Sequence, residues 1–184
     1  HLEDVPIDEV DQALPFRLPV QWVNRPNLDF RGFCGQIAGG TIKPGDKIKV
    51  MPSAKESTVK SIVTMDGELN EAVAGQSVTL TLNDEIDISR GDLICKGDHP
   101  AEIGNQFEAQ VLWMADEKMF PGRTYLMKCG TTNAQATLAT PKYKIDVNTM
   151  THEATRNLAL NEIGICNVSL DRYIPFDPYS ENRE

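Results

Sequence analysis

Apolar and polar residues alternate over short runs along most of the chain from Pro15 onward. A period of two sustained over about four to eight residues is typical of a half-buried β-strand. The clearest runs lie at positions 48–50, 78–82, 111–113, 125–129, 143–147 and 163–165. We therefore expect many short strands and little helix.

Turn-forming residues separate these runs, including Pro-Gly-Asp at 44–46 and Arg-Gly-Asp at 90–92. In both, we expect glycine to take positive φ and aspartate to bond nearby backbone amides. Many short strands at such spacing predict an all-β fold, here two antiparallel β-barrels. Only 149–160 favours a helical turn or two, because Thr151 offers a cap and Leu160 an apolar end.

The chain of 184 residues is long enough for two cores of about 85 residues each. Residues 99–104 show the weakest strand pattern and contain both proline and glycine, which favours a domain boundary there. The predicted organisation is an acidic lead-in at 1–14, a first barrel at 15–98, a linker at 99–104 and a second barrel at 105–184.

Charge narrows the possible partners, since 18 Lys and Arg residues face 27 Asp and Glu, a net charge of −9. A surface of that sign repels the phosphates that nucleic-acid binders must neutralise. No apolar run is long enough to span a membrane, and the residues after His1 do not form a signal peptide. We therefore expect no nucleic-acid partner and no membrane.

The four cysteines, Cys34, Cys95, Cys129 and Cys166, form no Cys-x-x-Cys pair and have no histidine at metal-ligand spacing. Each sits among apolar or strand-forming neighbours, which favours a small buried hydrophobe over a redox or metal role. This usage fits a reducing cytosol and predicts a cytoplasmic protein.

No catalytic residue, cofactor site or metal site is predicted. Residues 40–47 have two glycines at phosphate-loop spacing, but Asp46 replaces the lysine and Ile48 the Ser or Thr, so a turn is expected. The acidic residues of 83–87 are interpreted as an exposed turn. His152 is left open as a general base, although a solvated polar residue is preferred.

A polar stretch between the strand-like segments 20–23 and 33–35 is the most suggestive of function. Its two arginines, two asparagines and one phenylalanine resemble an interface rim. An ordinary surface loop explains them equally well. The candidate interface residues are Asn24, Arg25, Asn27, Asp29, Phe30 and Arg31.

Residues 32–50, GFCGQIAGGTIKPGDKIKV, resemble the first half of the second domain of translational GTPases, and 87–94, DISRGDLI, match the closing strand of that barrel. Within this elongation factor Tu-like superfamily, the chain from Pro15 to its end resembles the large, GTP-binding subunit of bacterial sulfate adenylyltransferase. That resemblance is carried by residues 20–37, 62–94, 111–116 and 158–170.

The resemblance implies a parent subunit whose GTPase domain couples GTP hydrolysis to synthesis of adenosine 5'-phosphosulfate from ATP and sulfate. The chemistry is then done on a small catalytic subunit, and GTP and Mg²⁺ belong to a GTPase domain that is not in this chain. The chain itself is expected to be the non-catalytic C-terminal barrels, which dock on the GTPase domain and on the small subunit.

In the family, the stretch equivalent to 175–183 is followed by an apolar strand, so the second barrel is expected to lack its last strand. Adding about twenty residues of the natural gene should then raise the melting temperature, and an unchanged value would contradict this. Two alternatives stay open: the barrels of an elongation factor Tu-like translation GTPase, which the charge disfavours, and a stand-alone β-barrel adaptor.

Overall fold

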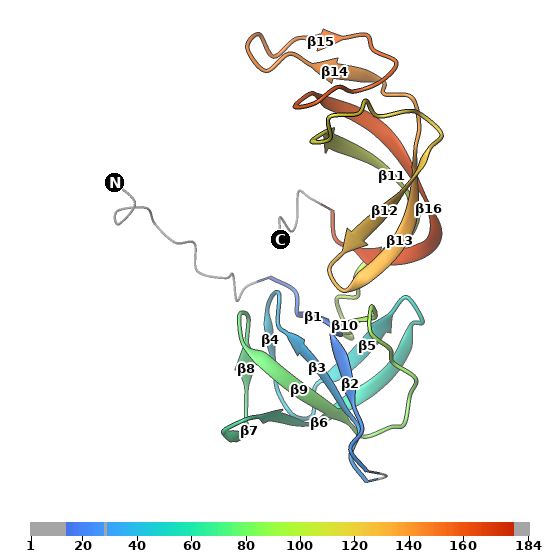
Figure 1. The fold of residues 1–184 in the computed structure, drawn as a ribbon. Helices are drawn as coiled ribbons and strands as arrows, with labels where there is room; N and C mark the ends of the chain where they lie inside the picture. The colour runs from blue at the N-terminus through green and yellow to red at the C-terminus, as the bar shows by residue number, and fades with distance from the viewer. Residues whose placement is uncertain (1–13, 28, 179–184) are drawn as a thin grey trace. The chain divides into compact units, whose positions relative to one another are not determined.

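The computed structural model describes residues 14–27 and 29–178, which contain β-strands but no helix (Figure 1). The prediction of an all-β, antiparallel fold is confirmed. The chain divides into two compact units. Unit 1 is His1–Ile103, Gly130–Thr132 and Pro175–Glu184, and unit 2 is Gly104–Cys129 and Asn133–Ile174.

Unit 1 carries ten short strands, β1 to β10. Most follow the order β1-β10-β5-β6-β9-β3-β2, with β7 on β6, and β4 pairs separately with β8. Their bounds are β1 Arg17–Pro19, β2 Trp22–Asn24, β3 Gly32–Gln36, β4 Thr41–Ile42, β5 Lys47–Met51, β6 Lys55–Thr64, β7 Gly67–Leu69, β8 Ala72–Val73, β9 Ser77–Leu82 and β10 Leu93–Lys96.

The segment that runs from β1 into β2 closes this sheet into a barrel. β1 pairs with β10 and β2 pairs with β3, so one continuous segment joins the two ends of the strand order. Between the two strands, the Val20 amide donates to the Asp92 carbonyl (2.9 Å) and the Gln21 amide donates to the Cys34 carbonyl (2.8 Å). No strand of the main path is left with a long open edge.

Closure removes the inward side chains of unit 1 from water. The alternation of β9 illustrates this, because Val78 and Leu80 point inward and are buried while Ser77 is exposed. The buried core of unit 1 consists mainly of Phe16, Leu18, Val20, Phe33, Ile37, Ile42, Ile48, Val50, Val59, Ile62, Ala72, Val78, Leu80, Ile88 and Ile94.

One charged side chain, Arg17, is buried in unit 1. Its guanidinium donates to both carboxylate oxygens of Asp177 at 2.8 Å and to the His99 carbonyl at 2.7 Å. A buried guanidinium needs such partners, because desolvation without pairing is costly. Arg17 thereby fastens two segments that are distant in sequence to β1.

Unit 2 is built on six strands, of which β16 is the longest. Their order is β12-β13-β16-β14-β15, with β11 on β16. Their bounds are β11 Glu102–Leu112, β12 Thr124–Cys129, β13 Thr132–Leu138, β14 Tyr143–Ile145, β15 His152–Glu153 and β16 Ile163–Phe176.

The sheet of unit 2 stays open within the described residues. There, β11 is paired with β16 alone and β12 with β13 alone, so each has an edge without a strand partner. The apolar side chains of these two strands are only partly buried against the unit 2 core; they are Phe107, Ala109, Val111, Tyr125, Met127 and Cys129, with Trp113 just beyond β11.

The helical turn expected within 149–160 is wrong. The Asp146 carboxylate accepts hydrogen bonds from the amides of Asn148 and Thr149, at 2.8 and 3.4 Å. These bonds form a hairpin turn that brings β15 back onto β14, with His152 opposite Ile145. Pairing of β15 with β14, which a local pattern does not reveal, overrides the weak helical pattern.

Candidate functional site

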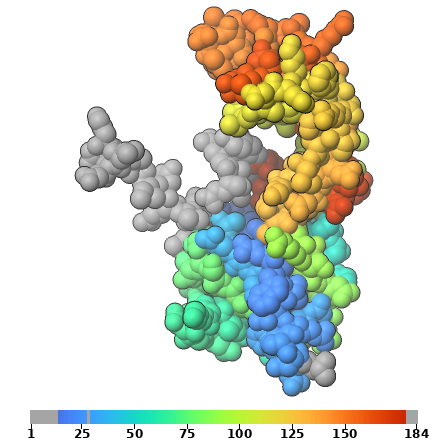
Figure 2. All heavy atoms as spheres, in the orientation of Figure 1, coloured from blue at the N-terminus to red at the C-terminus, as the bar shows by residue number. Residues whose placement is uncertain are grey.

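The predicted interface stretch forms the loop between β2 and β3, at the lower end of unit 1 in Figure 1. The blue residues of this part of the chain lie on the visible surface of unit 1 (Figure 2). Asn27 shapes the loop, because its side-chain oxygen accepts hydrogen bonds from the amides of Asp29 and Phe30 at 3.0 and 2.9 Å. Such an Asx-type turn ties the amides of Asp29 and Phe30 to the Asn27 side chain.

The two arginines of the loop have different environments. Arg25 is exposed, whereas Arg31 is half-buried and its guanidinium lies 5.6 Å from the centre of the Phe33 ring. Arg31 also lies 3.9 Å from an Asp87 oxygen, while its Nε atom is buried without a hydrogen-bond partner. Arg25 is therefore available to a partner, and Arg31 is largely engaged by unit 1.

Phe30 is held against the sheet by a glycine. A Cβ atom at Gly32 would lie 2.9 Å from Phe30 Cε1 and 2.4 Å from Thr79 Cγ2, so a larger residue would displace both side chains. Asn24, which ends β2, pairs with the same glycine. The residues Asn24, Asn27, Asp29, Phe30 and Arg31 thus form one structured loop, while Leu28 lies outside the described residues.

Beside the loop is a groove of about 340 Å³, lined by residues from the loop and from β6, β7 and β9. Phe30 and Arg31 contribute from the loop, and Lys60, Val63 and Glu68 contribute from β6 and β7. Sequence reasoning missed the last three because they lie about 30 to 40 positions away along the chain. Only the strand register brings them to the loop.

The register also places an apolar row beside this groove on the outer face of the sheet. Trp22 pairs with Cys34, Cys34 with Thr79, Thr79 with Val63, and Val63 with Glu68. Trp22 is 61% exposed. An outer sheet face is ordinarily polar, so a tryptophan followed by half-buried neighbours marks a surface suited to contact.

The phosphate-loop-like segment is a turn, as predicted. Gly45 has φ of 92°, and the Asp46 carboxylate accepts a hydrogen bond from the Lys43 amide at 3.0 Å. The later Gly-Asp turn repeats this chemistry, with Gly91 at φ of 102° and Asp92 accepting from the Ser89 amide at 2.8 Å. The shared turn chemistry expected from the sequence is confirmed at both places.

The acidic cluster at 83–87 is also engaged in local structure. Asp84 accepts from the Ser57 hydroxyl at 2.8 Å, and Asp87 lies 3.4 Å from Lys55 Nζ. His152 is exposed and stacks on Tyr143, with ring centres 3.9 Å apart. Over the described ranges, no cluster of three or more His, Cys, Asp or Glu side chains could hold a metal ion.

All four cysteines are free thiols. Cys95 and Cys166 are buried, as predicted, whereas Cys34 and Cys129 are half-buried. Burial raises the pKa of the Cys95, Cys129 and Cys166 thiols, which disfavours the reactive thiolate.

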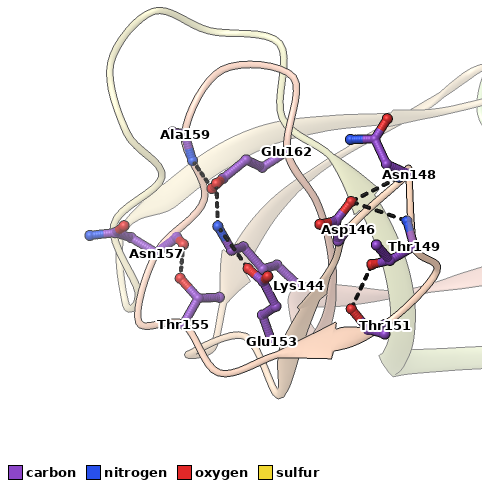
Figure 3. A network of polar contacts seen from close by, with 10 residues as sticks. All are labelled: Lys144, Asp146, Asn148, Thr149, Thr151, Glu153, Thr155, Asn157, Ala159 and Glu162. Atoms are coloured by element: carbon purple, nitrogen blue, oxygen red, sulfur yellow. Dashed lines mark hydrogen bonds and ion pairs between the residues drawn. The ribbon is translucent and has the colours of Figure 1, made fainter.

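Unit 2 contains a network of polar contacts around Lys144 (Figure 3). Lys144 Nζ lies 2.7 Å from a Glu162 oxygen and 3.4 Å from a Glu153 oxygen, and hydrogen bonding to Glu162 raises the pKa of this lysine. Glu162 also accepts from the Ala159 amide at 2.8 Å. The network joins β14, β15 and the loop before β16, and it is structural, because none of these groups faces a cavity described above.

The part of the chain that the structure describes contains no helix long and apolar enough to cross a membrane. Residues 34–95 match the family described as elongation factor Tu domain 2, and residues 106–184 match the GTP-eEF1A C-terminal domain-like family. The structure of Sup35 complexed with GDP matches with a TM-score of 0.83 at 18% identity, over 94% of this chain and 43% of that chain. The fold is therefore a pair of translation-factor-type β-domains.

Closer relatives give the particular family. The bifunctional enzyme NodQ of a Rhizobium species is 47% identical over 183 residues, which are 100% of this chain and 28% of that protein. Sulfate adenylyltransferase subunit 1 of Teredinibacter turnerae is 48% identical over 182 residues, 99% of this chain and 39% of that protein. This chain is a homologue of sulfate adenylyltransferase subunit 1, which confirms the resemblance found in the sequence, and it spans 28% to 39% of the length of these two relatives.

Proposed function

We propose that this chain forms the non-catalytic barrels of a sulfate adenylyltransferase subunit 1. In the parent protein, a GTPase domain that binds GTP and Mg²⁺ couples GTP hydrolysis to synthesis of adenosine 5'-phosphosulfate from ATP and sulfate. The adenylyl transfer takes place on a small catalytic subunit. The barrels dock on both and transmit the nucleotide state of the GTPase domain through contacts that differ between its GTP and GDP forms.

The observation that carries this proposal is the similarity to subunit 1 over essentially the whole chain. The likeness to Sup35 supports the fold alone, because the identity there is 18%. The loop from Asn24 to Arg31 is our candidate contact, since it presents Arg25, Asn27 and Asp29 to solvent on a backbone that Asn27 holds in place.

The test is made in the full heterodimer, with Arg25 and Arg31 both changed to Ala. We expect weaker GTP stimulation of adenylyl transfer, with adenylyl transfer in the absence of GTP unchanged. Arg25→Ala alone separates the exposed arginine from Arg31, whose contacts with Phe33 and Asp87 also serve folding. Arg156→Ala is the matched control, because Arg156 is an exposed arginine of unit 2.

Unchanged GTP stimulation in the double variant would remove this loop from the coupling contact. The alternative of a translation GTPase would be favoured by micromolar or tighter affinity for aminoacyl-tRNA in a filter-binding assay. The net charge of −9 opposes that outcome, because the tRNA backbone needs cationic contacts.

A further inference from the structure

The groove beside the β2–β3 loop combines an aromatic side chain and an aliphatic side chain with a lining that is otherwise mostly polar. Phe30 lies over Gly32 on one side, and Val63 contributes an aliphatic side chain from β6. Trp22 and Val63 lie in the same cross-strand row, with Cys34 and Thr79 between them. The Trp22 side chain is 61% exposed. Aromatic faces that are open to solvent attract cations as well as apolar groups.

The rim of the groove carries more negative than positive charge. Asp29, Glu68, Asp84 and Glu85 line it, against the two cations Arg31 and Lys60. Arg31 has contacts of its own, since its guanidinium lies 5.6 Å from the centre of the Phe33 ring and 3.9 Å from an Asp87 oxygen. Among the described residues, Glu68 and Glu85 form no ion pair, so their charge is available to an incoming group.

We propose that this groove binds an arginine or lysine side chain of an extended segment of a partner protein. The aliphatic stem lies against Phe30 and Val63, and the charged head meets a carboxylate of the rim, at Glu68 beside Val63 or at Glu85 beyond β9. This inference deepens the docking role proposed above. It rests on that proposed function in one respect, namely that the partner is a part of the same enzyme. A nucleic acid is the wrong occupant, because its phosphates would face the four carboxylates of the rim.

The size of the groove agrees with this occupant. Its volume of about 340 Å³ is at the lower end of the range of about 300–1,000 Å³ for small-ligand pockets. A single long side chain fits such a space. The hydroxyls of Ser61 and Thr81, which line the groove, are hydrogen-bonded to each other at 2.7 Å. These two groups therefore do not need a hydrogen-bond partner from the incoming side chain.

Isothermal titration calorimetry on the whole chain tests the proposal with two synthetic peptides. One alternates arginine with valine, and the other has glutamate in place of each arginine. We expect saturable binding of the first, with a dissociation constant of about 0.1 mM, that weakens as salt is added, and no binding of the second.

Variants then locate the binding. The double variant Glu68→Lys with Glu85→Lys should weaken binding of the arginine peptide about tenfold or more. The control is the double variant Glu102→Lys with Asp116→Lys, which changes the net charge equally at exposed positions outside the groove. It should not weaken binding. Phe30→Ala should weaken binding severalfold and Phe30→Tyr should preserve it. Circular dichroism confirms that each variant is folded.

Several results would overturn the proposal: no saturable binding, equal binding of the glutamate peptide, or equal losses in the groove and control variants. Because the titration needs only this chain, its outcome is independent of the coupling assay. Peptide binding together with GTP stimulation that is unchanged in the loop variants would keep the groove and remove the loop from the coupling contact. The reverse pattern would keep the function and sink the groove.

Discussion

Unit 1 and unit 2 have similar strand patterns but bury them differently. β9 of unit 1 alternates polar and apolar residues over six positions, and β12 of unit 2 alternates exposed and half-buried residues over six positions. Leu80 in β9 is fully buried, whereas Tyr125 and Met127 in β12 are only half-buried and Leu126 is 71% exposed. The sheet of unit 1 closes on itself, while β12 has an edge without a partner among the described residues. Alternation thus predicts a strand, and closure of the sheet decides how deeply its apolar face is buried.

Core truncations should show the largest difference between the units. Leu80→Ala removes a side chain with no exposed surface and should cost about 3–5 kcal/mol, because a cavity remains in a closed core. Met127→Ala in β12 should cost about 1 kcal/mol, since water already reaches that side chain. Hydrogen–deuterium exchange, read on peptides from β9 and β12, measures each unit separately. Similar losses at both positions would mean that unit 2 is as well closed as unit 1.

The buried ion pair of unit 1 should give the next largest effect. Arg17→Met removes the guanidinium that donates to Asp177 and to the His99 carbonyl, and should destabilise unit 1 by about 3 kcal/mol. The measurement is urea unfolding followed by exchange in β1 and β10. Arg25→Met, at an exposed position, is the control and should change little.

Asp177→Asn is measured in the wild-type chain and in the Arg17→Met variant. If it lowers the free energy of unfolding equally in both, the two side chains are not coupled and the ion pair does not hold unit 1 together. A strong coupling in this double-mutant cycle would support the pairing described here.

The turn chemistry of short segments could be predicted from the sequence, whereas the residues that meet at the groove are determined by the register of the strands. The turns at Gly45-Asp46 and Gly91-Asp92 were predictable because glycine conformation and aspartate hydrogen bonding act within a few residues. The meeting of Phe30 with Glu68 at one groove was not, because it depends on how β3, β9, β6 and β7 align.

The environment of Arg31 shows the same limit within the loop itself. Composition marked both arginines as interface candidates, yet only tertiary packing turns Arg31 toward the Phe33 ring and leaves Arg25 exposed. The helical turn expected after β14 failed for a related reason, since β15 pairs with β14 and holds His152 and Glu153 in an extended conformation.

Acid should produce the smallest effect, and it should act on unit 2. The Ala159 amide, and then Lys144, lower the pKa of Glu162; the Asn148 and Gln135 amides lower the pKa of Asp146 and Asp171 respectively. A carboxyl whose folded pKa is lowered contributes stability that is complete above its unfolded value of about 4 and disappears as the pH falls through the folded value. Unit 2 should therefore lose stability progressively as the pH falls below about 4.

Trp113 lies in unit 2 and Trp22 in unit 1, so Trp22→Phe leaves a fluorescence reporter of unit 2 alone. In that background, Glu162→Gln should lower the urea midpoint at pH 7 and flatten its fall toward pH 3, because the variant has one fewer carboxylate to protonate. Asp116→Asn, at an exposed position, should leave the pH profile unchanged. An equally steep fall in Glu162→Gln would show that this carboxylate does not stabilise the open sheet of unit 2, and would assign the acid sensitivity to Asp146 and Asp171.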